Sequence, residues 1–80
     1  MKKSDIVVGG YYEVRIPDVD DVYVYHVLDM EDVAYNYGLV YFDVYDEKGI
    51  LFNNGVSTLA TLANCVNRRV KPNSKHWTFL

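Results

Sequence analysis

The stretch LVYFDVYDEKG at residues 39–49 decides the fold, because apolar and polar residues alternate along it and then give way to turn residues. Alternation with a period of two is typical of a β-strand with one buried face. The residues predicted to be buried are Val40, Phe42 and Val44. The opposite face would carry Leu39, Tyr41, Asp43 and Tyr45. Gly49 suits the left-handed position of a hairpin turn, so the stretch predicts a strand followed by a β-hairpin.

The strand extends backwards to Val33, and Gly38 interrupts it. A glycine inside a strand pattern often marks a bulge or a bend, so we expect the strand to bend there. After the hairpin, residues 50–52 predict a short returning strand. Residues 53–55, Asn-Asn-Gly, are turn formers and are expected to end it.

Two further strands are predicted before this hairpin. Residues 11–16 alternate, with Tyr12 and Val14 on one face, and the Pro17–Asp21 stretch ends the strand. Residues 22–28 form the second strand, and residues 29–32 are expected to be a turn.

A short helix is predicted near residues 57–66, because four apolar residues recur at helical spacing: Leu59, Leu62, Ala63 and Val66. Either Ser57 or Thr58 is a suitable N-cap residue. The basic segment at residues 68–70 predicts a last short strand.

Length and composition indicate one small domain over residues 1–80, with residues 71–80 as an extended tail. Half of the residues are hydrophobic, which is too apolar for a disordered chain. The single cysteine, Cys65, excludes an internal disulfide framework. No apolar run is long enough to span a membrane, so we expect a cytoplasmic protein.

These elements predict a mainly β, β-rich α+β fold: a small, strongly bent antiparallel sheet or barrel of four or five strands with one helix. The segments VVGGYYEVRI, VYVYHVL and GLVYFDVYDEKG, followed by a short helix and a basic strand, resemble the SH3-like small β-barrels of phages and mobile elements. The resemblance covers residues 7–70. It implies a binding module in the host cell cytoplasm and brings no catalytic residues with it.

No motif for chemistry accompanies these strands. Cys65 lies at the end of the predicted helix and His26 in a valine-rich strand, so we expect both to serve packing. Three aspartates at residues 18–21 lack the spacing of a calcium loop. We therefore predict no enzyme activity, no cofactor and no metal site.

The charges are divided along the chain. Residues 13–47 hold ten acidic residues and one basic residue, Arg15, whereas residues 66–80 hold four basic residues and no acidic one. An acidic, tyrosine-rich face would attract a basic protein partner and imitate nucleic acid. We predict a non-enzymatic protein–protein interaction module, for example a phage-encoded inhibitor of a host defence or nucleic-acid-processing complex. Its predicted contact residues are Asp18, Asp20, Asp21, Tyr23, Tyr25, Tyr41, Asp43 and Tyr45.

The alternative is a small nucleic-acid-binding β-barrel that uses the basic C-terminal tail. Cationic side chains would contact phosphates, and an indole would stack on a base. The residues for this role are Arg68, Arg69, Lys71, Lys75 and Trp77. A homodimer anchored by the aromatic C-terminus is a further alternative.

Overall fold

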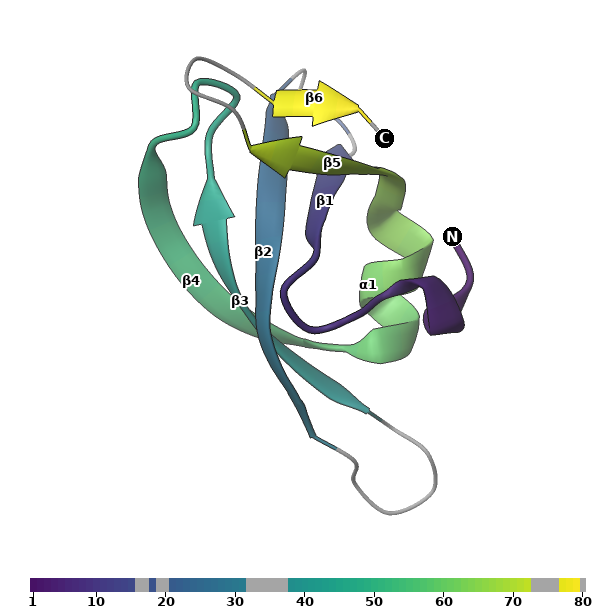
Figure 1. Ribbon diagram of the computed structural model, residues 1–80. Helices are drawn as coiled ribbons and strands as arrows, with labels where there is room; N and C mark the ends of the chain where they lie inside the picture. Colours follow the sequence, from purple (N-terminus) through teal and green to yellow (C-terminus); the bar gives the residue numbers. More distant parts are fainter. Residues whose placement is uncertain (16–17, 19–20, 32–37, 73–76, 80) are drawn as a thin grey trace.

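The computed structural model describes residues 1–15, 18, 21–31, 38–72 and 77–79. Figure 1 shows a single curved sheet with one short helix beside it. In chain order the elements are the 3-10 turn η1 (Lys3–Asp5), β1 (Tyr11–Arg15), β2 (Val22–Glu31), β3 (Leu39–Tyr45), β4 (Leu51–Thr58), α1 (Leu59–Cys65), β5 (Val66–Pro72) and β6 (Trp77–Phe79). The predicted β-rich class with one short helix is confirmed.

The strands lie in the order β4-β3-β2-β1-β5-β6, and all neighbours are antiparallel. Helix α1 carries the chain from β4 at one end of this order to β5, which pairs with β1. In Figure 1, β5 and β6 run across the direction of β2, so the sheet is strongly bent. Residues 71–80, the predicted tail, contribute the end of β5 and strand β6.

The sequence predicted a sheet that closes into a barrel, and for the described strands this prediction is wrong. Strand β4 pairs with β3 alone, and β6 pairs with β5 alone, so the sheet has two ends. Side chains of α1 and the N-terminal segment fill the inner face instead. The core is therefore covered by a helix and a turn, which removes the need for a closing strand pair.

The main buried cluster lies on this inner, concave face, and Val24 and Val70 are buried on the other side of the sheet. Cross-strand partners share a face, and the register joins Tyr12 to Tyr25 and Tyr25 to Val44. The buried cluster comprises Ile6, Tyr12, Val14, Val27, Val40, Phe42, Val44, Leu62 and Val66. Burial of the predicted stripe of β3 is thus confirmed.

Helix α1 begins where the sequence predicts. Thr58 is the N-cap, and its hydroxyl oxygen accepts a hydrogen bond of 3.2 Å from the backbone N–H of Thr61. Leu62 and Ala63 are buried, and the N-terminal ammonium of Met1 donates a 3.1 Å hydrogen bond to the carbonyl of Ala63. None of the helices in the described part of the chain is long and apolar enough to cross a membrane.

The hairpin after β3 is also confirmed: Gly49 has a φ of +85°, and its N–H donates to the carbonyl of Asp46. Two predicted turns, however, are strand. Residues 53–55 lie inside β4, and residues 29–31 belong to β2. Pairing with β3 overrides the local turn preference at both places. The predicted start of β3 at residues 33–37 lies outside the described residues.

Candidate protein-binding face

The predicted tyrosine face is divided between the two sides of the sheet. Tyr23 and Tyr25 lie on the inner side, where the Tyr25 ring stacks on Phe42 with 4.4 Å between centroids. Tyr41, Asp43 and Tyr45 lie on the outer side. The prediction of one shared face is therefore wrong. Alternation fixes which residues of one strand share a face, whereas the pairing register fixes which faces of two strands coincide.

The outer side brings together rings from three strands. The Tyr11 ring of β1 stacks on the imidazole of His26 in β2, with centroids 4.0 Å apart and planes 3° from parallel. The Tyr45 ring of β3 lies 6.4 Å from Tyr11, tilted by 49°. Asp43 is the cross-strand partner of His26, so a carboxylate lies in the same row. Tyr11 and His26 were not predicted, although alternation along β1 and β2 could have placed them on the side opposite Tyr12 and Tyr25.

A second row extends the outer side towards the far end of β2 and β3. A register irregularity between Val27 and Asp29 makes Asp29 the partner of Tyr41, which brings this carboxylate to the outer side. The Tyr41 hydroxyl donates a 2.8 Å hydrogen bond to Oε2 of Glu31. On the outer side, the phenols of Tyr41 and Tyr45 thus flank Asp43 along β3, and the carboxylates of Asp29 and Glu31 lie on the neighbouring β2.

We call this surface the acidic aromatic face. It consists of Tyr11, His26, Asp29, Glu31, Tyr41, Asp43 and Tyr45. The hydrogen bond to Glu31, and then the charge of that carboxylate, raise the pKa of Tyr41. Desolvation, followed by the charge of Asp43, raises the pKa of Tyr45. Both shifts favour the neutral phenol, because burial at Tyr45 and the contact with Glu31 at Tyr41 disfavour the phenolate.

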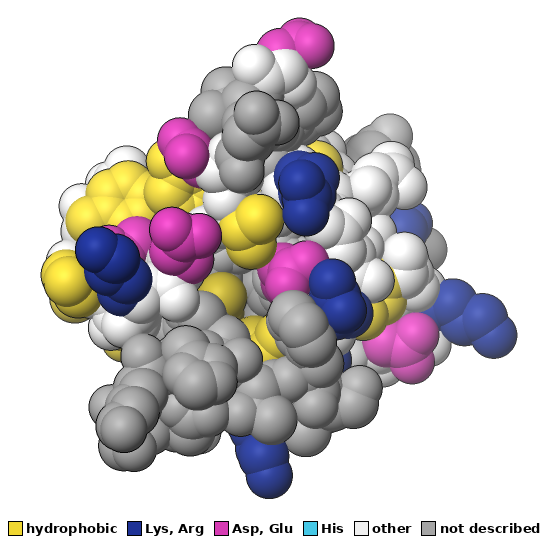
Figure 2. Space-filling view, turned by 90° about the horizontal axis from the view of Figure 1, so that it is seen from above, with side chains coloured by type: hydrophobic (Ala, Val, Ile, Leu, Met, Phe, Trp, Pro, Cys, Tyr) yellow, Lys and Arg dark blue, Asp and Glu magenta, His cyan; other side chains and the backbone are white. Residues whose placement is uncertain are grey.

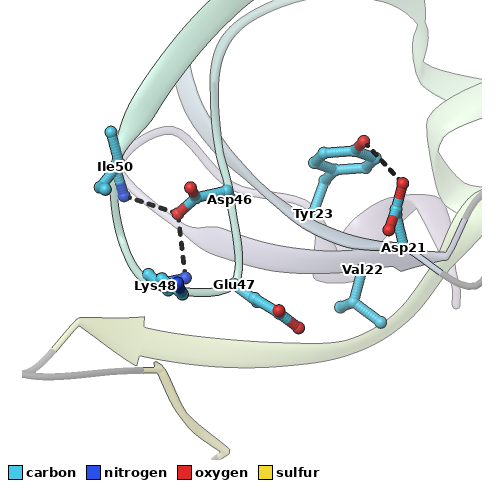
Figure 3. Close-up of a pocket in the computed structure, with 7 residues that line it drawn as sticks. All are labelled: Asp21, Val22, Tyr23, Asp46, Glu47, Lys48 and Ile50. Atoms are coloured by element: carbon cyan, nitrogen blue, oxygen red, sulfur yellow. Dashed lines mark hydrogen bonds between the residues drawn. The ribbon is translucent and has the colours of Figure 1, made fainter.

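The acidic residues near the hairpin form a separate group. Asp21, Tyr23 and Asp46 line a shallow depression of about 280 Å³, seen in Figure 3. The carboxylate of Asp46 accepts 2.9 Å hydrogen bonds from the N–H groups of Lys48 and Ile50, so it supports the turn. Desolvation, and then the charge of Asp21, raise the pKa of Tyr23.

The remaining predicted aspartates do not extend the acidic aromatic face. Asp18 is exposed and has a φ of 67°, a left-handed conformation in which aspartate is tolerated. Asp20 lies outside the described residues. The structure therefore brings together three of the eight predicted contact residues on the outer side and two more at the depression.

The basic residues that support the alternative function are spread over both sides of β5. Nε of Arg68 lies 3.3 Å from Oε1 of the buried Glu13. The guanidinium of Arg69 lies over the Tyr12 ring, 5.9 Å from its centroid, and Lys71 is exposed. Lys75 and the side chain of Trp77 lie outside what is described. Figure 2 shows acidic and basic side chains interspersed over this end of the molecule, so nucleic-acid binding stays a prediction without a described basic patch.

Two residues considered for chemistry have definite positions. Cys65 is an exposed free thiol at the end of α1, so its predicted packing role is wrong: the buried side of this short helix is taken by Leu62 and Ala63. His26 stacks on Tyr11 on the outer side of the sheet. Within the described residues, no group of three or more His, Cys, Asp and Glu side chains is arranged to hold a metal ion.

Comparison of the chain with family models, with curated proteins and with solved structures found no match. The function therefore has to be argued from the geometry of the acidic aromatic face.

Proposed function

We propose that the protein is a non-enzymatic binding module whose acidic aromatic face docks on a basic surface of another protein. The observation that carries this proposal is the gathering of three carboxylates, Asp29, Glu31 and Asp43, with three tyrosine rings on one side of the sheet. Tyrosine is enriched in protein interfaces, where it offers a large apolar ring and a hydrogen-bonding hydroxyl. The carboxylates would steer a cationic partner and fix its orientation.

A protein that normally binds nucleic acid fits this face by its chemistry. Such a protein presents Lys and Arg side chains to phosphates, and rows of carboxylates reproduce the sign of that charge. By covering the surface that binds nucleic acid, the module would act as an inhibitor; the resemblance to small barrels of phages implies a binding module. The order of the elements supports an open variant of the SH3-like fold: consecutive antiparallel strands, then a short helix and a basic strand.

Two variants that remove equal charge test the proposal. The face variant D29N/E31Q/D43N removes three negative charges from the acidic aromatic face. The control variant D5N/D18N/E47Q removes three exposed charges elsewhere, and asparagine tolerates the left-handed backbone of residue 18. All six changes keep the shape of the side chain, so the amide oxygen that E31Q introduces can still accept a hydrogen bond from the Tyr41 hydroxyl.

Partners captured from the cells in which the protein occurs would be quantified for all three proteins. We expect the wild type and the control to capture the same protein, and the face variant to bind it at least about tenfold more weakly, with affinity falling as salt rises. Nucleic acid should compete for the captured protein. If the face variant captured as much of this protein as the wild type does, the proposal would be contradicted.

A further inference from the structure

Strand β4 is an edge strand with an open flank. It pairs with β3 on one side, and none of the described strands pairs with its other side. In Figure 1 it runs along the outside of the sheet. Alternate backbone N–H and C=O groups of an edge strand point away from the sheet and are free to pair with another strand.

This edge has one of the features that usually prevent pairing, a register shift at Val44/Tyr45 that leaves Phe52 of β4 without a partner in β3. The sequence LFNNGVST holds no charged residue and no proline over its eight residues. Leu51, Phe52 and Val56 are each more than half exposed. The opposite end of the sheet is different, because β6 has three residues and the neighbouring β5 carries Arg68, Arg69 and Lys71. Natural proteins protect edges with charges, proline, bulges or short strands, and residues 53–58 of β4 contain no charge, no proline and no bulge.

We propose that β4 pairs antiparallel with β4 of a second copy of this chain, forming a two-fold dimer with one continuous sheet. A second copy fits better than the basic partner of the acidic aromatic face, because β4 offers no carboxylate to attract a basic chain. Two identical uncharged strands meet without repulsion. Oδ1 of Asn53 accepts a 2.9 Å hydrogen bond from the backbone N–H of Asn54, whereas the side-chain amide of Asn54 is both a donor and an acceptor and can pair with its own kind across the two-fold axis.

The dimer would place both acidic aromatic faces on the same side of the continuous sheet, since a two-fold axis perpendicular to a sheet keeps its sides. Asp43 is the partner of Asn54, one strand from the edge. The two Asp43 carboxylates would therefore be three strand spacings apart, roughly 14 Å or more. This exceeds the screening length of about 8 Å at physiological ionic strength. Their repulsion is therefore largely screened, so salt above physiological strength should leave the dimer unchanged, whereas it weakens binding of a basic partner.

The test compares the wild type with Val56→Lys and with the matched control Leu28→Lys. Val56 and Leu28 are both exposed apolar strand residues, at 55% and 47%, but Leu28 lies in β2, away from the open edge. Light scattering and sedimentation would give the mass over a range of protein concentrations. We expect a dimer for the wild type and the Leu28 variant, and dissociation at least about tenfold easier for Val56→Lys, because a lysine on an edge strand opposes pairing and the two copies would bring like charges to the junction.

Amide hydrogen exchange supplies a second measurement that does not depend on a variant. Protection of the backbone amides in β4 should rise with protein concentration, whereas protection of the amides in β5 should be the same at all concentrations. A monomer at all concentrations, an assembly larger than a dimer, or a dimer unaffected by Val56→Lys would overturn the proposal. Because the face variant leaves β4 unchanged, the dimer and the proposed function can fail independently.

Discussion

At the scale of single residues, Tyr12 connects the N-terminal segment to the sheet. Its ring is fully buried, and its hydroxyl donates to the carbonyl of Asp5 at 2.9 Å and accepts from the N–H of Val7 at 2.8 Å. Gly10 makes room for this ring, because a Cβ at residue 10 would lie only 2.5 Å from the hydroxyl oxygen. The η1 turn and Ile6 are thereby held over the inner face.

Replacing this hydroxyl should weaken the fold. Tyr12→Phe leaves the N–H of Val7 and the carbonyl of Asp5 without their partner, so we expect the free energy of unfolding to fall by about 1–3 kcal/mol. Tyr41→Phe is the matched control, because the Tyr41 hydroxyl bonds to Glu31 at the exposed surface, and its loss should change stability by less than about 0.5 kcal/mol. Urea denaturation measures both. A loss for Tyr12→Phe as small as that expected for Tyr41→Phe would show that the Tyr12 hydrogen bonds add no stability.

At the scale of elements, β4 and α1 show when local preference decides and when pairing decides. The turn formers at residues 53–55 become strand because β3 offers a continuous partner. Gly55 also faces Phe42, and a Cβ there would lie 3.1 Å from the ring, so a residue that disfavours strands fits the core at this position. Directly beyond Thr58, none of the described strands pairs with the chain, and Thr58 starts the helix as its local chemistry predicts.

The cap should be measurable because α1 is only seven residues long. We expect Thr58→Ala to lower the free energy of unfolding by about 1 kcal/mol, since the N–H of Thr61 loses its acceptor. Thr58→Ser keeps the hydroxyl and should recover most of the loss. Thermal unfolding followed by circular dichroism compares the two. A serine variant as unstable as the alanine variant would assign the effect to the lost methyl group.

At the scale of the whole molecule, a sheet with two ends is stabilised through its inner face. Side chains from the N-terminal segment, the strands and α1 meet in one buried cluster. A chain of 80 residues is expected to have a total stability of about 4–12 kcal/mol. One large core residue therefore represents a substantial part of the stability.

Leu62 is the test of this dependence, because it is 2% exposed and joins α1 to the core. We expect Leu62→Ala to lower the free energy of unfolding by about 2–5 kcal/mol through loss of burial and the cavity left behind. Asn64→Ala, at an exposed position of the same helix, should change it by less than about 0.5 kcal/mol. Chemical denaturation of both variants gives the comparison. A small effect at residue 62 would mean that the sheet is stable without its helix.

The sequence by itself determined the features that depend on neighbours along the chain. Alternation predicted the buried stripe of β3, Gly49 predicted the hairpin, and Thr58 predicted the start of α1. Each follows from the period of a strand, the freedom of glycine at positive φ, or a cap one turn away. The sequence alone also shows the excess of carboxylates in the first half of the chain.

Only the tertiary structure decided which side of the sheet each strand shows to its neighbour, and hence the composition of the binding face. In the structure, Tyr25 packs against the core from the inner side, and Tyr11 and His26 lie on the outer side with Asp43. The tertiary structure also left β4 at an open edge and kept the sheet from closing. The physical reason is that register and closure depend on backbone pairing between segments far apart in sequence, and a shift of one residue reverses every side chain of a strand.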